Sequence, residues 1–170
     1  GAGGGGAGGL RTGLVGEDDE DDETTTDVVY DGSAAGGGSS RVVGINDFDL
    51  LTVIGLGSFG RVMKVRERRT GTIYAMKILD KQQILANRMV QHTQAEKDIM
   101  RTVDHPFVCK LHFAFQTRKH LVLVLTFLCG GELFFHLQRC GRFSESRAKF
   151  YAAEIGCALE YIHSQNIIYR

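Results

Sequence analysis

Three glycines and the segment that follows them constrain the fold of this chain more than any other feature. Gly55, Gly57 and Gly60 form a Gly-x-Gly-x-x-Gly run. In a dinucleotide-binding fold such a run leads into a helix whose N-terminus holds a pyrophosphate. Here residues 61–66 instead show the β-branched, period-2 pattern that is typical of a strand. The glycine loop is therefore predicted to join two strands, and a dinucleotide-dependent oxidoreductase is disfavoured.

A lysine lies on the next predicted strand. Residues 48–54 lead up to the glycines as a first strand, residues 69–72 have the composition of a turn, and residues 73–79 form a third strand that carries Lys77. Glycines let backbone N–H groups approach a polyphosphate without a Cβ in the way, and the lysine brings positive charge to the same anion. The combination predicts a phosphate-binding site.

Further motifs occur at the spacing of a protein kinase. Glu96 lies nineteen residues after Lys77, on a segment whose apolar residues recur at helical spacing, and Pro106 follows that segment as a helix stop. The order of strand, glycine loop, strand, turn and strand with lysine is the protein-kinase order. Residues 47–170 therefore resemble the start of a eukaryotic-type serine/threonine protein kinase of the AGC group.

The resemblance implies an α+β fold. We expect a protein-kinase-like small lobe, made of a five-stranded antiparallel sheet plus a regulatory helix, followed by the first helices of a large, mainly helical lobe. The expected boundaries are a disordered tail rich in glycine and acidic residues at 1–46, the small lobe and hinge at 47–128, and the incomplete start of the large lobe at 129–170.

Two later segments are predicted from their own patterns. Residues 111–116 and 121–127, joined by a polar turn, form a hairpin that completes the five-stranded sheet. In the last segment apolar residues recur at i, i+3 and i+4, and Ser144 is a suitable N-cap. A final helix is therefore expected to begin after Ser144.

The resemblance also assigns roles to individual residues. Lys77 and Glu96 would be the catalytic pair, with the carboxylate holding the lysine in position. The carbonyl of Thr126 and the N–H of Leu128 would pair with the adenine edge, and Glu132 would contact the ribose and a substrate arginine. The full set of expected nucleotide-binding residues is Ile54, Gly55, Gly57, Ser58, Phe59, Gly60, Val62, Ala75, Lys77, Cys109, Leu125, Thr126, Leu128 and Glu132.

By the same resemblance the protein would use ATP and Mg²⁺ to phosphorylate serine or threonine near arginine in protein substrates. It would itself be activated by an upstream kinase. The chain ends at Arg170, one residue before the position of the family's catalytic aspartate, and the Asp-Phe-Gly motif lies further on. We therefore expect that the metal ligands lie beyond Arg170 and that none lies within these residues. We also expect no kinase activity from the 170 residues alone. The alternative is a truncated, non-catalytic pseudokinase that binds nucleotide, or a partner through the groove beside the helix bearing Glu96.

Charge is unevenly placed along the chain. Residues 1–46 hold nine acidic and two basic residues, whereas residues 47–170 hold eleven acidic and eighteen basic residues. The first segment also contains fourteen of the 22 glycines and few aromatic residues, so it is expected to be disordered. It is either a solvated linker or an autoinhibitory or partner-binding tail that folds over the basic part. A net charge of zero gives no case for nucleic-acid binding.

The sequence offers no sign of a membrane segment or of a disulfide framework. It has no secretory signal and no apolar run of about 18 residues. Its four cysteines lack Cys-x-x-Cys spacing, and its six histidines do not complete a metal set. We expect reduced thiols in a cytoplasmic or nuclear protein.

Overall fold

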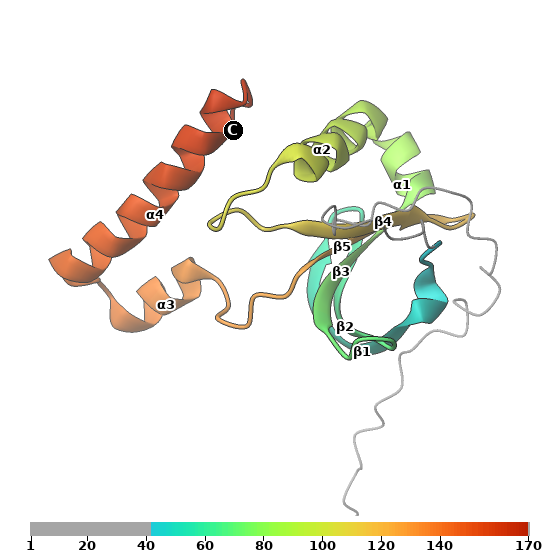
Figure 1. Ribbon diagram of the computed structural model, residues 1–170, viewed down its shortest axis with the longest axis horizontal. Helices are drawn as coiled ribbons and strands as arrows, with labels where there is room; N and C mark the ends of the chain where they lie inside the picture. The colour runs from blue at the N-terminus through green and yellow to red at the C-terminus, as the bar shows by residue number, and fades with distance from the viewer. Residues whose placement is uncertain (1–41, 170) are drawn as a thin grey trace, which may run out of the picture.

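The computed structural model describes residues 42–169 and is built around a five-stranded antiparallel sheet (Figure 1). The spatial order of the strands is β1-β2-β3-β5-β4, and this confirms the predicted small-lobe sheet. The strands are β1 (Phe48–Gly57), β2 (Gly60–Glu67), β3 (Ile73–Asp80), β4 (Leu111–Gln116) and β5 (His120–Thr126). The helices are α1 (Lys81–Ala86), α2 (Val90–Thr102), α3 (Leu133–Cys140) and α4 (Glu145–Ser164), with a 3-10 turn at Ile45–Asp47.

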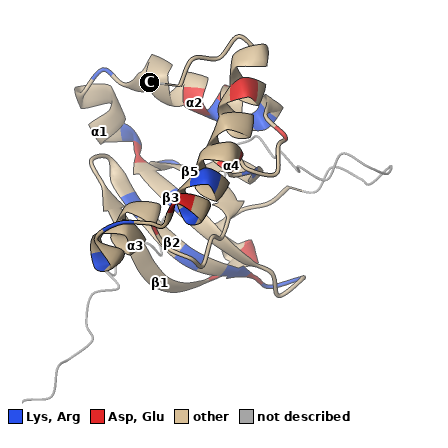
Figure 2. Cartoon of the chain, turned by 90° about the vertical axis from the view of Figure 1, so that its left-hand side faces the viewer, with Lys and Arg blue, Asp and Glu red and all other residues tan. Residues whose placement is uncertain are grey.

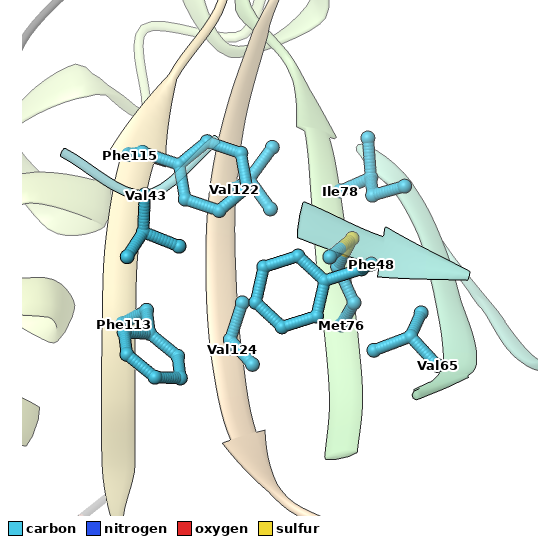
Figure 3. Packing of buried hydrophobic residues seen from close by; sticks show 9 residues of the cluster. All are labelled: Val43, Phe48, Val65, Met76, Ile78, Phe113, Phe115, Val122 and Val124. Carbon is cyan, nitrogen blue, oxygen red and sulfur yellow. The ribbon is translucent and has the colours of Figure 1, made fainter. Parts of the chain in front are cut away.

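One face of the sheet carries the main hydrophobic core (Figure 3). Met76 and Val124 are fully buried there, and the ring of Phe48 stacks on that of Phe115 with centroids 6.3 Å apart. Side chains alternate along a strand, so residues 75 and 77 of β3 point to the other face. The members of this cluster are Val43, Phe48, Val65, Met76, Ile78, Phe113, Phe115, Val122 and Val124.

Val43 joins this core although the sequence assigned it to the tail. Its side chain is 5% exposed and lies beside Phe113 and Phe115 of β4 (Figure 3). The 3-10 turn that follows is fixed by the N–H of Gly44, which donates to Oδ2 of Asp47 at 2.9 Å. Residues 43–46 therefore belong to the folded part, whereas most of the predicted disordered tail lies outside the described residues.

Helices α1 and α2 pack on the opposite face. Asp80 begins α1, because its Oδ1 accepts hydrogen bonds from the N–H groups of Gln82 and Gln83 at 2.7 and 3.0 Å. This short helix was not predicted. Helix α2 ends at Thr102, ahead of Pro106 as expected, and packs through Met100 against a second cluster made of Leu111, Ala114 and Leu123.

Helices α3 and α4 lie to one side of the sheet (Figure 1). Oγ of Ser144 accepts a hydrogen bond from the N–H of Arg147 at 3.3 Å, which confirms the predicted N-cap. Helix α4 has no buried residue but meets the loop before β4: the N–H of Asp104 donates to the Tyr161 hydroxyl at 3.1 Å, and the His105 ring stacks on the Tyr161 ring. Within residues 42–169, no helix is long and apolar enough to cross a bilayer.

Candidate functional site: a cavity beneath the glycine loop

Strand register brings the candidate residues to one face of the sheet. Val62 of β2 is paired with Lys77 of β3 and also with Gly55 of β1, and Ala75 of β3 is paired with Leu125 of β5. Directly opposed residues project to the same side of a sheet. The side chains of Val62, Ala75, Lys77 and Leu125 therefore share the face opposite the main core.

Lys77 and Glu96 form an ion pair that joins β3 to α2. The Nζ atom of Lys77 donates a hydrogen bond to Oε1 of Glu96 at 2.6 Å, and the two side chains are 29% and 40% exposed. Both residues line a cavity of about 230 Å³ beneath the loop between β1 and β2. The predicted residues that line the same cavity are Gly57, Ser58, Phe59, Gly60 and Val62. The structure thus gathers the glycine loop, the lysine and the glutamate around one space.

Two glycines of the loop differ in whether the protein fold requires them. A Cβ on residue 60 would overlap the backbone carbonyl of Ile78 on β3, so Gly60 is needed for the close approach of two strands. A Cβ on residue 57 would meet the nearest protein atom, the carbonyl oxygen of Gly60, at an ordinary 3.7 Å. The protein itself does not require a glycine at position 57. Because residue 57 has no Cβ, a ligand in the cavity can approach its backbone closely.

At the hinge, Thr126 is held through its backbone and its side chain. Its N–H donates to the carbonyl of Lys110 at 3.0 Å, and its Oγ1 lies 2.8 Å from Nε2 of His112. Its carbonyl, the predicted adenine acceptor, accepts a weak bond from Sγ of Cys109 at 3.7 Å. Burial raises the pKa of the Cys109 thiol above its ordinary value, so this group stays protonated. Cys109, Thr126 and Leu128 line a second cavity, of about 910 Å³, which extends to α4.

A comparison with known families decides what this arrangement is. Residues 48–170 match the protein kinase domain family. This chain belongs to the protein kinase family. The match covers both the cavity beneath the glycine loop and the hinge.

Curated relatives place the chain among AGC-type serine/threonine kinases. It is 57% identical over 126 residues to serine/threonine-protein kinase sgk-1 of Caenorhabditis elegans, covering 74% of this chain and 27% of that one. It is 52% identical over 128 residues to RAC-beta serine/threonine-protein kinase A of Xenopus laevis, covering 75% and 26%. It is 51% identical over 131 residues to serine/threonine-protein kinase YPK2/YKR2 of Saccharomyces cerevisiae, covering 77% and 19%. The chain thus spans about a quarter or less of these kinases.

The structure does not bring every predicted nucleotide residue of this kinase into one slot. Glu132 is the N-cap of α3, where its side chain makes no capping hydrogen bond. The predicted residues that line neither the loop cavity nor the hinge cavity are Ile54, Gly55, Ala75, Leu125 and Glu132. The predicted nucleotide residues that line a cavity are thus divided between two cavities, one beneath the glycine loop and one at the hinge.

Other residues of this kinase domain line the site without having been predicted. Met89 and Thr93 reach the loop cavity from the beginning of α2, and Thr93 lies three residues before Glu96, on the same side of the helix. That spacing is the sequence signal that could have found Thr93. Lys64 lines neither cavity, but its Nζ lies 5.0 Å from the ring centroid of Phe127 in the hinge, as in a cation–π contact.

Proposed function

We propose that the cavity beneath the glycine loop receives the phosphates of ATP, and that the whole protein transfers the γ-phosphate to serine or threonine in protein substrates. The observation that carries this proposal is the 2.6 Å contact between Nζ of Lys77 and Oε1 of Glu96 at the wall of the cavity. A carboxylate that fixes a lysine beside the phosphates is the arrangement that kinases use for positioning and charge neutralisation. The supporting family match makes this the best-supported function.

The residues of the site fit the two ends of ATP differently. At the phosphate end, Gly57 exposes backbone and Lys77 supplies a positive charge. At the adenine end, the carbonyl of Thr126 accepts a weak bond from the Cys109 thiol, which an adenine amino group can replace. The N–H of Leu128 is the proposed second contact. ATP supplies the phosphoryl group. These residues bind and orient it.

Magnesium has no ligand set among the described residues. Within residues 42–169, no group of three His, Cys, Asp or Glu side chains is arranged to hold a metal ion. The proposal therefore routes no step through a metal held by these residues. The role assigned to them is to hold the nucleotide and to neutralise part of its charge through Lys77.

The proposed substrates carry arginine upstream of the target hydroxyl. Glu132 supports this proposal, because its carboxylate lies at an exposed N-cap without a capping hydrogen bond and so remains available to a guanidinium group. An upstream activating kinase and a cytoplasmic or nuclear location are part of the same proposal. A non-catalytic pseudokinase is less well supported, since the three relatives described above are all named as kinases.

The nucleotide proposal is tested by thermal unfolding of the 170-residue chain with ATP or NAD, followed by titration of ATP. ATP is expected to raise the melting temperature, whereas NAD is not. Lys77→Met is expected to weaken ATP binding by about tenfold or more, since a hydrogen bond to a charged group contributes about 1.5–3 kcal/mol. Lys119→Met, at an exposed turn position, is the matched control. Equal losses for both variants, or equal stabilisation by NAD, would contradict the proposal.

The activity proposal is tested on the full-length protein with a peptide array. Phosphorylation is expected on serine or threonine peptides with an upstream arginine, and Lys77→Met is expected to abolish it. Glu132→Gln is expected to reduce the preference for arginine more than the total rate on other peptides. An array without any arginine preference would remove the substrate proposal while leaving the nucleotide site intact.

A further inference from the structure

Lys64 lies on the same face of the sheet as the proposed nucleotide site, but outside both of its cavities. It is paired with Ala75 of β3 and follows Val62 by two residues, so its side chain projects to the face that bears Val62. Strand β2 carries two other basic residues, Arg61 and Arg66, and Figure 2 colours all three blue. Lys64 lines neither the loop cavity nor the hinge cavity. Its position therefore does not indicate direct contact with the nucleotide.

The charge of Lys64 is directed at the hinge instead. Its Nζ lies 5.0 Å from the centroid of the Phe127 ring, and a cation within about 6 Å of an aromatic ring is attracted to the ring face. Nη2 of Arg66, on the same face of β2, lies 2.8 Å from Oδ2 of Asp49. No ion pair among residues 42–169, in contrast, includes Lys64. The ring of Phe127 is therefore the partner that the structure gives to this charge.

A small residue on β3 leaves room for this contact. Strand β3 lies between β2 and β5, and Ala75 is paired with Lys64 on one side and with Leu125 on the other. The aliphatic stem of a lysine can lie along apolar surface while its ammonium group reaches a more distant partner. Phe127 follows the end of β5 at Thr126. The contact thus joins β2 to the end of a strand that is not its neighbour in the sheet.

Phe127 lies between the two backbone groups that are proposed to bind adenine. The carbonyl of Thr126 precedes it and the N–H of Leu128 follows it. How these two groups are oriented relative to each other depends on the backbone dihedral angles of residue 127, because the peptide units on either side are planar. A contact that holds Phe127 therefore restricts both groups. Strand β2 begins at Gly60, so the same contact also links the end of the glycine loop to the hinge.

We propose that Lys64 is a positioning residue of the nucleotide site, which acts through Phe127 by holding the hinge backbone in the arrangement that receives adenine. This inference rests on the proposed contacts of adenine with Thr126 and Leu128. It concerns the adenine end alone, because Lys64 does not line the cavity assigned to the phosphates. A pre-organised site binds more tightly although the ligand gains no new contact.

The test is calorimetric titration of the full-length protein with adenosine, ATP and tripolyphosphate. It is done at about 0.15 M salt, where charges further apart than about 8 Å are largely screened. Lys64→Gln keeps most of the length of the side chain and removes its charge. It is expected to weaken adenosine and ATP binding about two- to fivefold, as the loss of one cation–π contact does, and to leave tripolyphosphate binding unchanged. Lys119→Gln, at an exposed turn position, is the matched control and is expected to change none of the three affinities.

Two further variants separate positioning from a general effect on the fold. Lys64→Arg is expected to retain the adenosine affinity of the unmodified protein, because a guanidinium group also stacks on aromatic faces. Phe127→Leu is expected to cause the same loss as Lys64→Gln, and the two substitutions together no greater loss than either alone. In peptide phosphorylation, Lys64→Gln is expected to raise KM for ATP while kcat stays the same, as the loss of uniform binding does.

The possible results distinguish this inference from the proposed function. Adenosine is uncharged, so tripolyphosphate binding that falls as much as adenosine binding would assign Lys64 to the phosphates and overturn the inference. Unchanged adenosine affinity in Lys64→Gln, failure of Lys64→Arg to retain it, or additive losses in the double variant would overturn it as well. In all of these cases the proposed function stands. An unmodified protein that binds neither adenosine nor ATP would instead contradict the proposed function, and this inference with it.

Discussion

Gly60 lies so close to Ile78 that a side chain on residue 60 would overlap the Ile78 carbonyl oxygen. Gly60→Ala must therefore push β2 away from β3 and is expected to lower the free energy of unfolding by about 1–3 kcal/mol, as overpacking does. Gly57→Ala meets only ordinary contacts and is expected to leave stability nearly unchanged while weakening ATP binding. Urea unfolding and ATP titration of both variants measure the difference. Equal destabilisation would show that the two glycines have the same structural role.

Glu96→Gln is expected to affect ATP binding more than stability. The Lys77–Glu96 pair is partly exposed, and exposed ion pairs contribute about 0–1 kcal/mol to folding. Loss of the carboxylate charge, however, frees the lysine and is expected to weaken ATP binding severalfold in titration calorimetry. When Glu96→Gln is combined with Lys77→Met, the second substitution is expected to cause little further loss of ATP affinity, because the two residues act as one unit. Asp98→Asn on the same helix is the control, and a similar loss of ATP affinity there would argue against a specific role for Glu96.

Cys109 is expected to react more slowly with iodoacetamide than the other three cysteines. Its thiol is half-buried and has a raised pKa, whereas Cys129, Cys140 and Cys157 are exposed. If adenine binds at the hinge, ATP is expected to slow the alkylation of Cys109 further and to leave Cys129 unaffected. Mass spectrometry of peptides over a time course gives both rates. Unchanged labelling of Cys109 at saturating ATP would place the adenine elsewhere.

His112 is expected to make stability depend on pH. Burial, with a smaller contribution from the charge of Lys110, lowers its pKa below the ordinary value of 6.5. The unfolded chain therefore takes up a proton at a higher pH than the folded chain does. The contribution of neutral His112 to the free energy of unfolding is fully present above pH 6.5 and is lost as the pH falls below that value.

This dependence is measured by urea midpoints between about pH 7 and about pH 5. The decrease is expected to be smaller in His112→Gln than in the unmodified chain. His163→Gln, at the exposed end of α4, is expected to leave the decrease as it was. If the two variants have the same pH dependence, His112 is not its source.

Local patterns predicted most of the elements because each strand alternates and is bounded by turn residues. The resemblance to the kinase family predicted the pair of Lys77 and Glu96, which the structure places in contact. Helix α1 was missed, although Asp80 followed by Gln83 has the acceptor-x-x-Gln pattern of a capping box and Asp80 does cap the helix. The missing signal was length, since six residues are too few to show a helical period.

What the sequence could not predict depends on how distant segments meet. Val43 is buried because β4 comes to lie beside it, and nothing in the local composition around Val43 indicates this contact. The division of the nucleotide residues between two cavities likewise depends on how α4 and the hinge lie relative to the glycine loop. The nucleotide role of the individual residues stays a prediction, for which the experiments above are the test.

Strand β3 carries the main core and the proposed chemistry on alternate residues. Met76 and Ile78 face the core, while Ala75 and Lys77 face the nucleotide side. A shift of the strand pairing by one residue would bury the lysine and expose the methionine, so it would disrupt both the core and the proposed site. Single-residue insertions or deletions within Ile73–Asp80 should therefore abolish function, whereas the turn before the strand can vary in length.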